Sequence, residues 1–536
     1  RGRSTARCRW RSARAPGCSS TSTASRPSPS TTRGPTRAAT SRPARRPGSP
    51  TAPSPRPSTS SSATPRPRPS GAPVAEPAWW QSAVVYQVYL RSFQDSDGDG
   101  IGDLEGLRRR LPWLAGELGV DVLWLSPIHP SPDIDFGYDV ADYVGVHPLY
   151  GDLAAFDRLV EEARQRGLRI VLDGVFNHTS DQHDWFVQSR DEPGGPFGDF
   201  YIWRDGKRPN NWAGVFGGSA WKWVEARQQS YLHSFAPEQP DLNWRNPAVE
   251  DAVLDSMRFW FERGVSGFRL DVFNCCLKDP ELRDNPRRWD PLGLVGGLVY
   301  GFIGQDHIHD RDHPDLARVL GRMRALADAH DAFLVGETLD ERLRYDNAAQ
   351  WVGDDLLHMA FHFRLLHSRW GATRFARAIR AQAEALGPGR WPTWVFSNHD
   401  FKRVASRWGD DDARVKLVAL LATTLRGTPY LYNGDELGLR EARLSRAQIQ
   451  DPPGKRFWPL YQGRDGCRTP MQWDASPEAG FTHGAPWLPV SDDFATRNVA
   501  TMQADPDSVL SVWRRALAVR KQRPVLQLGR QHGPLD

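Results

Sequence analysis

From residue 79 onward, short apolar runs alternate with longer segments in which apolar residues recur every three or four positions. The short runs are rich in β-branched and aromatic residues, which is typical of buried parallel strands, whereas the longer spacing is typical of helices that pack on a sheet. Eight strands are predicted, at 84–91, 120–126, 168–176, 266–273, 333–339, 357–366, 393–398 and 428–433. Eight such βα units predict an α/β fold, a closed TIM (β/α)8 barrel.

Helices are predicted at 153–166, at 247–263 beginning with Pro247, and at 412–425. An amphipathic helix at 506–523 is expected to close the fold, after an irregular stretch at 440–505. The gap between the third and fourth strands is too long for a simple crossover. Because 179–246 is rich in Trp, Gly, Pro and Asn, it is predicted to be a loop-rich insertion over the carboxyl face of the barrel, which then comprises 79–178 and 247–525.

Charge is distributed unevenly along the chain. Residues 1–75 contain 15 Arg and no acidic residue, and they consist mainly of Arg, Ser, Pro and Thr. Such a segment cannot form a core, so it is predicted to be disordered, with an artefact of the start site or reading frame as the open alternative. The rest of the chain carries 54 basic and 64 acidic residues, which argues against a nucleic-acid partner.

The chain contains neither an apolar stretch of about 18 residues, as a membrane span requires, nor a recognisable secretory signal. The expected location is therefore the cytoplasm, with no membrane partner. A monomer or weak oligomer is expected.

Polar side chains gather where the predicted strands end. Asp173, Asn177 and His178 close the third strand, Arg269 and Asp271 the fourth, Glu337 the fifth, and His399 with Asp400 the seventh. A lone acid in such a place usually caps the next helix. Three acids aimed into one funnel from separate strands instead predict glycoside hydrolysis, in which one acid protonates the leaving oxygen and another attacks or stabilises the sugar carbon.

The local sequence suggests how two of these acids ionise. Arg269 lies two residues before Asp271 and therefore on the same face of the strand, so its charge is expected to lower the pKa of that carboxyl. Glu337 follows Val335 and Gly336 with no adjacent cation, so it is expected to stay protonated more easily, as a general acid must.

Five motifs in order carry a family resemblance: LDGVFNH (172–178), QPDLNW (239–244), GFRLDVFN (267–274), GETL (336–339) and FSNHD (396–400). Together they resemble the α-amylase family of retaining glycosidases, of glycoside hydrolase 13 type, over residues 79–525. The resemblance implies that Asp271 is the nucleophile, Glu337 the general acid/base, and Asp400 a third carboxylate that binds sugar hydroxyls. It also implies that Arg269 holds Asp271 ionised and that His178 and His399 bind the sugar in the first subsite.

Two further segments resemble the exo-acting α-glucosidases and oligo-1,6-glucosidases of that family. In DFGY (135–138), Asp135 would bond the terminal sugar and Tyr138 would stack on it. In GRDGCRTPMQW (463–473), Arg464, favoured over Arg468, would pair with Asp135 to close the pocket. A purely structural ion pair remains the alternative. Val272, directly after the nucleophile, resembles the α-1,6-preferring enzymes.

DSDGDGIGD (95–103) matches the first half of a calcium loop, with acids at alternate positions and a glycine for the turn. The expected ligands of a structural Ca²⁺ or Mg²⁺ are Asp95, Asp97, Asp99, the Ile101 carbonyl and Asp103. The twelfth position is Gly106 rather than Glu. A plain Asp/Gly turn is the alternative, and no organic cofactor is expected.

Members of the resembling family usually carry a β-sandwich after the barrel. Here that domain is predicted to be absent or truncated, with 526–536 as its remnant. The expected function is a retaining exo-α-glucosidase that removes terminal α-linked glucose from isomaltose- or maltose-type oligosaccharides. The alternative is a transglucosylase or sugar isomerase that forms trehalose or isomaltulose. A non-catalytic relative is disfavoured because all three acids are present.

Overall fold

The computed structural model describes residues 76–291, 293, 301–340 and 342–529. The predicted disordered segment 1–75 and the last seven residues of the predicted remnant at 526–536 lie outside the described residues. Among those that are described, no helix is long and apolar enough to cross a membrane.

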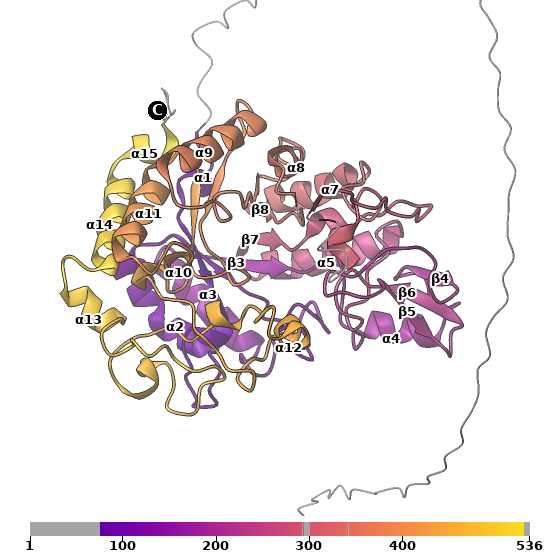
Figure 1. Cartoon of the computed structure of the whole chain (residues 1–536), viewed down its shortest axis with the longest axis horizontal. Helices are drawn as coiled ribbons and strands as arrows, with labels where there is room; N and C mark the ends of the chain where they lie inside the picture. Colours follow the sequence, from indigo (N-terminus) through magenta and orange to yellow (C-terminus); the bar gives the residue numbers. More distant parts are fainter. Residues whose placement is uncertain (1–75, 292, 294–300, 341, 530–536) are drawn as a thin grey trace, which may run out of the picture. The chain divides into compact units, whose positions relative to one another are not determined.

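All eight predicted strands are present and form one parallel sheet (Figure 1). They are β1 (Val85–Val88), β2 (Val122–Leu125), β3 (Arg169–Gly174), β7 (Val265–Leu270), β8 (Phe333–Gly336), β9 (Met359–Ala360), β10 (Thr393–Val395) and β11 (Thr428–Tyr432). The pairing order is β10-β11-β1-β2-β3-β7-β8-β9. Its two ends meet where Thr393 Oγ1 donates a 2.8 Å hydrogen bond to Ala360 O. The predicted (β/α)8 barrel is therefore confirmed.

Helices cover the outside of the barrel, and capping side chains explain where two of them begin. The longer ones are α2 (Leu104–Pro112), α3 (Leu153–Gln165), α5 (Pro247–Glu262), α7 (Leu316–Ala329), α9 (Ala372–Leu386), α11 (Asp412–Thr424) and α14 (Val509–Gln522). Asp152 accepts from Ala155 N at the start of α3, and Ser508 accepts from Ser511 N at the start of α14. The four helices predicted from the sequence match α3, α5, α11 and α14 within three residues at each end.

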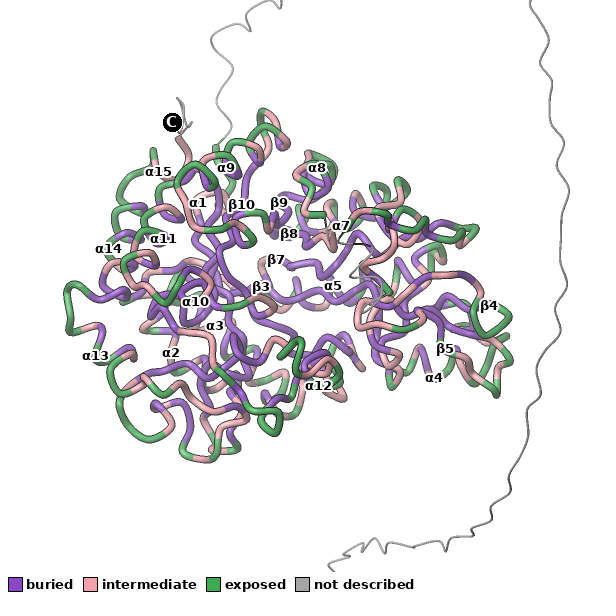
Figure 2. The backbone as a smooth tube through the Cα atoms, in the orientation of Figure 1, coloured by how far each residue is buried: buried purple, intermediate pink, exposed green. Residues whose placement is uncertain are grey.

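Shorter helices fill the connections. They are α1 (Trp79–Ser82), α8 (Tyr345–Ala349), α10 (Val404–Arg407), α12 (Pro452–Phe457), α13 (Val499–Ala504) and α15 (Pro524–Leu528). Single tight turns occur at Leu90–Ser92, Phe273–Cys275, Gly301–Gly304, Asp435–Leu437, Asp465–Cys467 and Pro477–Gly480, and a π-helical turn at Trp113–Leu118 extends α2. Figure 2 shows the barrel strands buried, with exposed positions concentrated on the outer helices and loops.

The sixth strand is much shorter than predicted. A run at 357–366 was expected, but β9 contains only Met359 and Ala360. Beyond it the chain turns, and His367 N donates a 3.0 Å hydrogen bond to Phe363 O, which is a helical rather than an extended pattern. The apolar residues in this run therefore serve a turn as well as a strand.

The insertion after β3 contains more regular structure than its composition predicted. It includes α4 (Asp184–Asp191) and an antiparallel sheet of β4 (Trp203–Asp205), β5 (Trp221–Val224) and β6 (Gln229–Leu232), in the order β4-β6-β5. Trp212, Trp221 and Leu232 are buried together at its centre. Strands of three or four residues are too short to show a clear two-residue period, which is why the sequence pattern missed them.

Candidate active site

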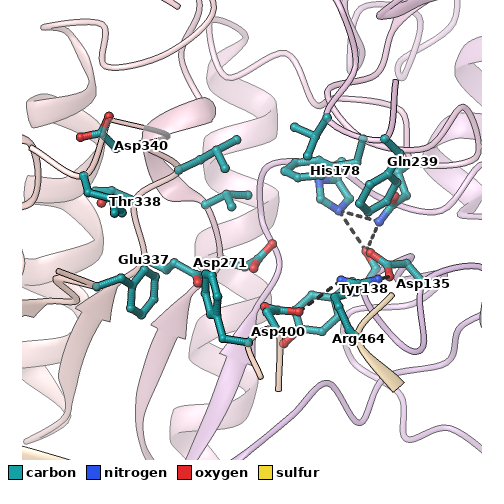
Figure 3. Close-up of a pocket in the computed structure, with 18 of the residues that line it drawn as sticks. Asp135, Tyr138, His178, Gln239, Asp271, Glu337, Thr338, Asp340, Asp400 and Arg464 are labelled. Atoms are coloured by element: carbon teal, nitrogen blue, oxygen red, sulfur yellow. Dashed lines mark hydrogen bonds and ion pairs between the residues drawn. The ribbon is translucent and has the colours of Figure 1, made fainter. Parts of the chain in front are cut away.

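Three acidic side chains meet where barrel strands end. Asp271 directly follows β7, Glu337 directly follows β8, and Asp400 lies in the loop after β10. All three line one cavity of about 460 Å³. Figure 3 shows Glu337 and Asp271 on one side of the cavity and His178 and Asp135 on the other, with Asp400 between them beside Arg464. The barrel thus brings together three acids that are far apart in the sequence.

Arg269 lies behind this cavity and is almost fully buried. Its Nη1 donates to Asp173 Oδ1 at 2.5 Å and to Asp271 Oδ1 at 2.8 Å, and its Nη2 contacts the Glu337 carboxyl. Arg269 lowers the pKa of Asp271 as expected, but burial has the larger effect and raises that pKa to about 6. One guanidinium contacts three carboxyls here, so its charge cannot fully offset the effect of burial on the pKa of each.

Glu337 has no cation beside it in the sequence, as noted above, but it has one in space, because Arg269 contacts its carboxyl. In the β7–β8 register Arg269 is opposite Val335, so the two side chains share a face. Glu337 follows Val335 by two positions and therefore points the same way. The sequence shows no adjacent cation, but the neighbouring strand supplies one.

Asp400 is surrounded by cations. Its Oδ1 accepts from Arg464 Nη1 at 3.2 Å and from Arg468 Nη2 at 3.0 Å. Burial acts to raise its pKa, but the neighbouring positive charges hold that pKa well below its usual range. Asp400 is therefore an anion throughout the neutral range.

Asp135 and Arg464 form an ion pair in the cavity wall. Arg464 Nη2 donates to Asp135 Oδ1 at 2.5 Å and to Asp451 Oδ1 at 2.7 Å, and Asp451 is fully buried. Arg468 instead donates through Nε to His399 O at 2.8 Å and braces Asp400. Arg464 is thus the arginine beside Asp135, and Arg468 lies behind the lining.

The two predicted sugar-binding histidines occupy different places. His178 lines the cavity, and its Nε2 lies 3.0 Å from Tyr138 O. His399 lies behind Tyr138 rather than in the lining, with its Nε2 2.7 Å from the Tyr138 hydroxyl and its Nδ1 2.8 Å from Gln87 Nε2. Burial lowers the pKa of both rings, that of His399 to about 3, so both are neutral at pH 7.

Val272 lines the cavity directly after Asp271 and adopts a left-handed backbone conformation, with φ 34° and ψ 38°. A β-branched residue is rarely found there because its side chain crowds the backbone. Such strain occurs mostly where a site fixes the position of a side chain. It places Val272 in the lining of the cavity beside Asp271.

Three of the predicted metal ligands lie together. Single carboxylate oxygens of Asp95, Asp97 and Asp99 are all within 4.8 Å of one another. Asp103 is not in this group; its Oδ1 caps α2 by accepting from Gly106 N at 2.7 Å. A glutamate could not replace Gly106, because a Cβ there would lie 2.0 Å from Gln94 O. The loop therefore departs from the calcium-loop pattern for a steric reason.

Several contributors to the site were not identified from the sequence. Gln239 lines the cavity and donates to Tyr138 O at 3.0 Å; it begins the QPDLNW motif, which was the available signal. Phe216 lies in a Gly-rich loop of the insertion with no signal of its own. Lys278 Nζ lies 2.6 Å from Asp241 Oδ2, and both side chains are buried. This pair fastens the insertion to the segment after β7.

The model of the alpha-amylase family described as "Alpha amylase, catalytic domain" matches residues 87–529. The chain belongs to this family. It is 47% identical over 464 residues to a Rhizobium meliloti (strain 1021) protein named "Probable alpha-glucosidase", with 84% of each chain covered. It is 38% identical over 496 residues to the oligo-1,6-glucosidase of Parageobacillus thermoglucosidasius, with 85% of each covered.

Among solved structures, the alpha-glucosyl transfer enzyme XgtA is similar, with a TM-score of 0.81, 43% identity, and coverage of 84% of this chain and 86% of that one. These relatives of the alpha-amylase family confirm the resemblance that the five motifs indicated. The chain is a glycoside hydrolase by family.

Proposed function

We propose that this protein is a retaining exo-α-glucosidase that releases terminal α-linked glucose from short oligosaccharides. The observation that supports this proposal most directly is the cavity that Asp271, Glu337 and Asp400 line together with the Asp135–Arg464 ion pair, which closes one wall. A wall at one end of the pocket suits a chain end rather than the middle of a polysaccharide. The similar α-glucosidases support this substrate class.

In this mechanism Asp271 attacks the anomeric carbon while Glu337 donates a proton to the leaving oxygen. With a pKa of about 6, Asp271 is mostly ionised at pH 7. The anionic Asp400 and the Arg464 guanidinium beside it lie where they can bind sugar hydroxyls. Water activated by Glu337 then breaks the bond between glucose and Asp271, which retains the α-configuration.

The shared contact with Arg269 supports retention rather than inversion. Both Asp271 and Glu337 contact the same guanidinium, which holds their carboxyls close together. Retaining enzymes place the two groups about 5–5.5 Å apart, whereas inverting enzymes need more room for a water molecule between acid and base.

The direct test is Asp271→Asn, with Asp255→Asn on the exposed face of α5 as the matched control. The first variant should lose several orders of magnitude in turnover of an aryl α-glucoside because the covalent route is lost. The control should behave as the parent does. Near-native hydrolysis by Asp271→Asn would overturn the assignment.

A second candidate, glucosyl transfer on the same scaffold, is favoured by one observation, the similarity to the alpha-glucosyl transfer enzyme XgtA. It shares the intermediate on Asp271 and differs only in whether water or another hydroxyl takes the glucose. Product analysis with a sugar acceptor present separates the two.

We propose further that Val272 favours α-1,6-linked substrates. The branched side chain beside the nucleophile narrows the space for a sugar joined through a secondary hydroxyl, whereas the extra methylene of a 6-linkage can swing clear. A few such contacts are worth ~1–3 kcal/mol in discrimination.

We also propose that Ca²⁺ or Mg²⁺ binds at the loop 95–103 and stabilises the fold. Three oxygen-bearing acids within reach of one ion suit a hard cation, and the cation would relieve their mutual repulsion. Asp95 accepts from the backbone N–H groups of Asp97, Gly98 and Gly100, so the loop is already shaped around it. The Ile101 carbonyl is the remaining ligand expected from the pattern.

A further inference from the structure

Gln87 is a polar residue in the interior of the barrel. It lies on β1 two positions after Val85, which packs with Trp124 and Tyr430 in an apolar cluster, so the two β1 side chains face the same way. Gln87 is 1% exposed. A buried amide costs free energy unless it is hydrogen-bonded, so a glutamine at this position needs a partner.

The Gln87 side chain has a single partner among the described residues, which is His399. Gln87 Nε2 lies 2.8 Å from His399 Nδ1, whereas Gln87 Oε1 has no partner in the part of the chain that the structure describes. An apolar side chain of similar size would fill the same space without leaving a buried oxygen unpaired. The contact with His399, and not packing, therefore explains the amide.

The surroundings of His399 indicate which ring nitrogen carries the hydrogen. The ring is buried and neutral at pH 7, so only one of its nitrogens is an N–H. Its Nε2 lies 2.7 Å from the Tyr138 hydroxyl and 3.3 Å from Oδ2 of the anionic Asp400, which can only accept. This arrangement favours the hydrogen on Nε2 and leaves Nδ1 to accept from Gln87 Nε2.

From His399 Nε2 the hydrogen bonds continue to Asp271. The Tyr138 hydroxyl donates to Asp173 Oδ2 at 3.0 Å. Asp173 Oδ1 accepts from Arg269 Nη1, which also donates to Asp271 Oδ1. The rings of His399 and Tyr138 are within 1° of parallel, which suits a hydrogen bond in the plane of the imidazole. With the hydrogen on Nδ1 instead, the Tyr138 hydroxyl would turn away from Asp173 to donate to Nε2.

We infer that Gln87 is a positioning residue, whose amide fixes His399 as the Nε2–H tautomer and thereby holds the Tyr138 hydroxyl on Asp173. The inference rests on the proposed function, because the wall that Tyr138 lines is where the terminal glucose would bind. Without a donor at Nδ1, the ring can carry its hydrogen on either nitrogen, and the Tyr138 hydroxyl turns with it. The cavity then has the arrangement that orients the sugar for only part of the time.

The first test is ¹⁵N NMR of protein labelled at histidine, because protonated and unprotonated ring nitrogens have distinct chemical shifts. His399→Gln identifies the signals of this ring by their loss. In the parent, Nδ1 should be unprotonated and Nε2 protonated. Gln87→Leu removes the donor and should bring the two shifts closer together, as a mixture of tautomers does. Gln87→Glu places an acceptor at the same point and should move Nδ1 toward the protonated shift.

The second measurement separates kcat from KM on an aryl α-glucoside. Gln87→Leu should lower kcat by about 10- to 100-fold with a smaller change in KM, since a misplacement of ~1 Å near the reacting atoms costs up to ~100-fold. Gln382→Leu is the matched control, because Gln382 is also buried and its Nε2 donates at 3.0 Å to Thr393 O, outside the cavity lining. This variant should keep the His399 shifts and the kcat of the parent.

The parent spectrum tests the tautomer without any variant, and a His399 ring with its hydrogen on Nδ1 would overturn the inference. Ring shifts that neither Gln87 variant changes, or a kcat that falls as far in Gln382→Leu as in Gln87→Leu, would overturn it as well. A parent that has the Nε2–H ring but hydrolyses no α-glucoside would instead overturn the proposed function.

Discussion

Replacing Arg269 tests how the buried charges of the site are balanced. Its guanidinium is 1% exposed and contacts Asp173, Asp271 and Glu337. Arg269→Met keeps much of the side-chain volume but leaves three buried carboxyls without their shared cation. Arg269→Lys keeps a charge but cannot reach all three with one planar group.

The expected magnitude follows from the pKa of Asp271. That pKa is about 6 with Arg269 present. An opposite charge within ~4–6 Å lowers the pKa of an acid by ~1–3 units, so its loss should raise the pKa to roughly 7–9. Asp271 must be ionised to attack, so activity falls as the pH falls through this pKa. The acid limb of kcat/KM should therefore move to higher pH by ~1–3 units in Arg269→Met and by less in Arg269→Lys.

The pH dependence of stability gives a second measurement, and it runs in the opposite direction to the pH dependence of activity. Because the pKa of Asp271 is raised above its ordinary 3.8, the folded state binds this proton more tightly than the unfolded state. Stability is therefore lost as the pH rises from about 4 through the folded pKa. In Arg269→Met the folded pKa is higher, so the Tm should keep falling over a wider range of pH.

The assay is a pH profile of kcat/KM on an aryl α-glucoside, whose leaving group needs little protonation. Arg263→Met is the matched control, since Arg263 pairs with Asp157 at the surface and such pairs contribute ~0–1 kcal/mol. Its acid limb should coincide with that of the parent. If the folded Arg269→Met variant has the same acid limb of kcat/KM as the parent, Arg269 does not determine the ionisation of Asp271 and the reasoning fails.

Three further outcomes are expected. Glu337→Gln should lose most activity on oligosaccharides but less on an activated aryl glucoside, because only the former need a proton donor; equal losses in kcat/KM would contradict its role as acid. A chelator should lower the Tm and excess calcium should restore it, because an ion held by Asp95, Asp97 and Asp99 binds only the folded state. A melting curve that neither treatment changes would show that these residues hold no stabilising ion. Val272→Ala, which removes the branched methyl groups, should lower the kcat/KM ratio of isomaltose to maltose; an unshifted ratio would assign linkage preference to the surrounding loops.

The strands were predictable because this barrel buries both faces of its sheet. A strand such as β2 is a continuous apolar run, and α5 begins at Pro247, directly after Asn246, whose side chain accepts from Ala248 N. The prediction was too long at β9, where the apolar residues continue into a turn. Apolar runs of this length do not distinguish a strand from a turn that is also buried.

The positions of the three cavity acids could be predicted from the sequence because strand ends converge by the geometry of the fold. The ionisation of these acids could not be predicted, because their pKa values depend on side chains that are neighbours in space but not in sequence. Arg269 reaches Asp173 on β3 and Glu337 after β8, and neither contact follows from local spacing. Burial, which dominates the pKa of Asp271, is likewise a property of the closed barrel.

The loop residues that line the cavity mark a further limit of what strand ends can predict. Phe216 and Phe401 are separated by 185 positions and lie in loops whose sequences predict no element, yet they line the same cavity. Strand ends determine which bond is broken, because they carry the acids. Loops determine which leaving group or acceptor fits on the other side of that bond, because they form the part of the cavity wall that this group contacts. The linkage and acceptor preferences must therefore be inferred from the assembled cavity wall rather than from the motifs.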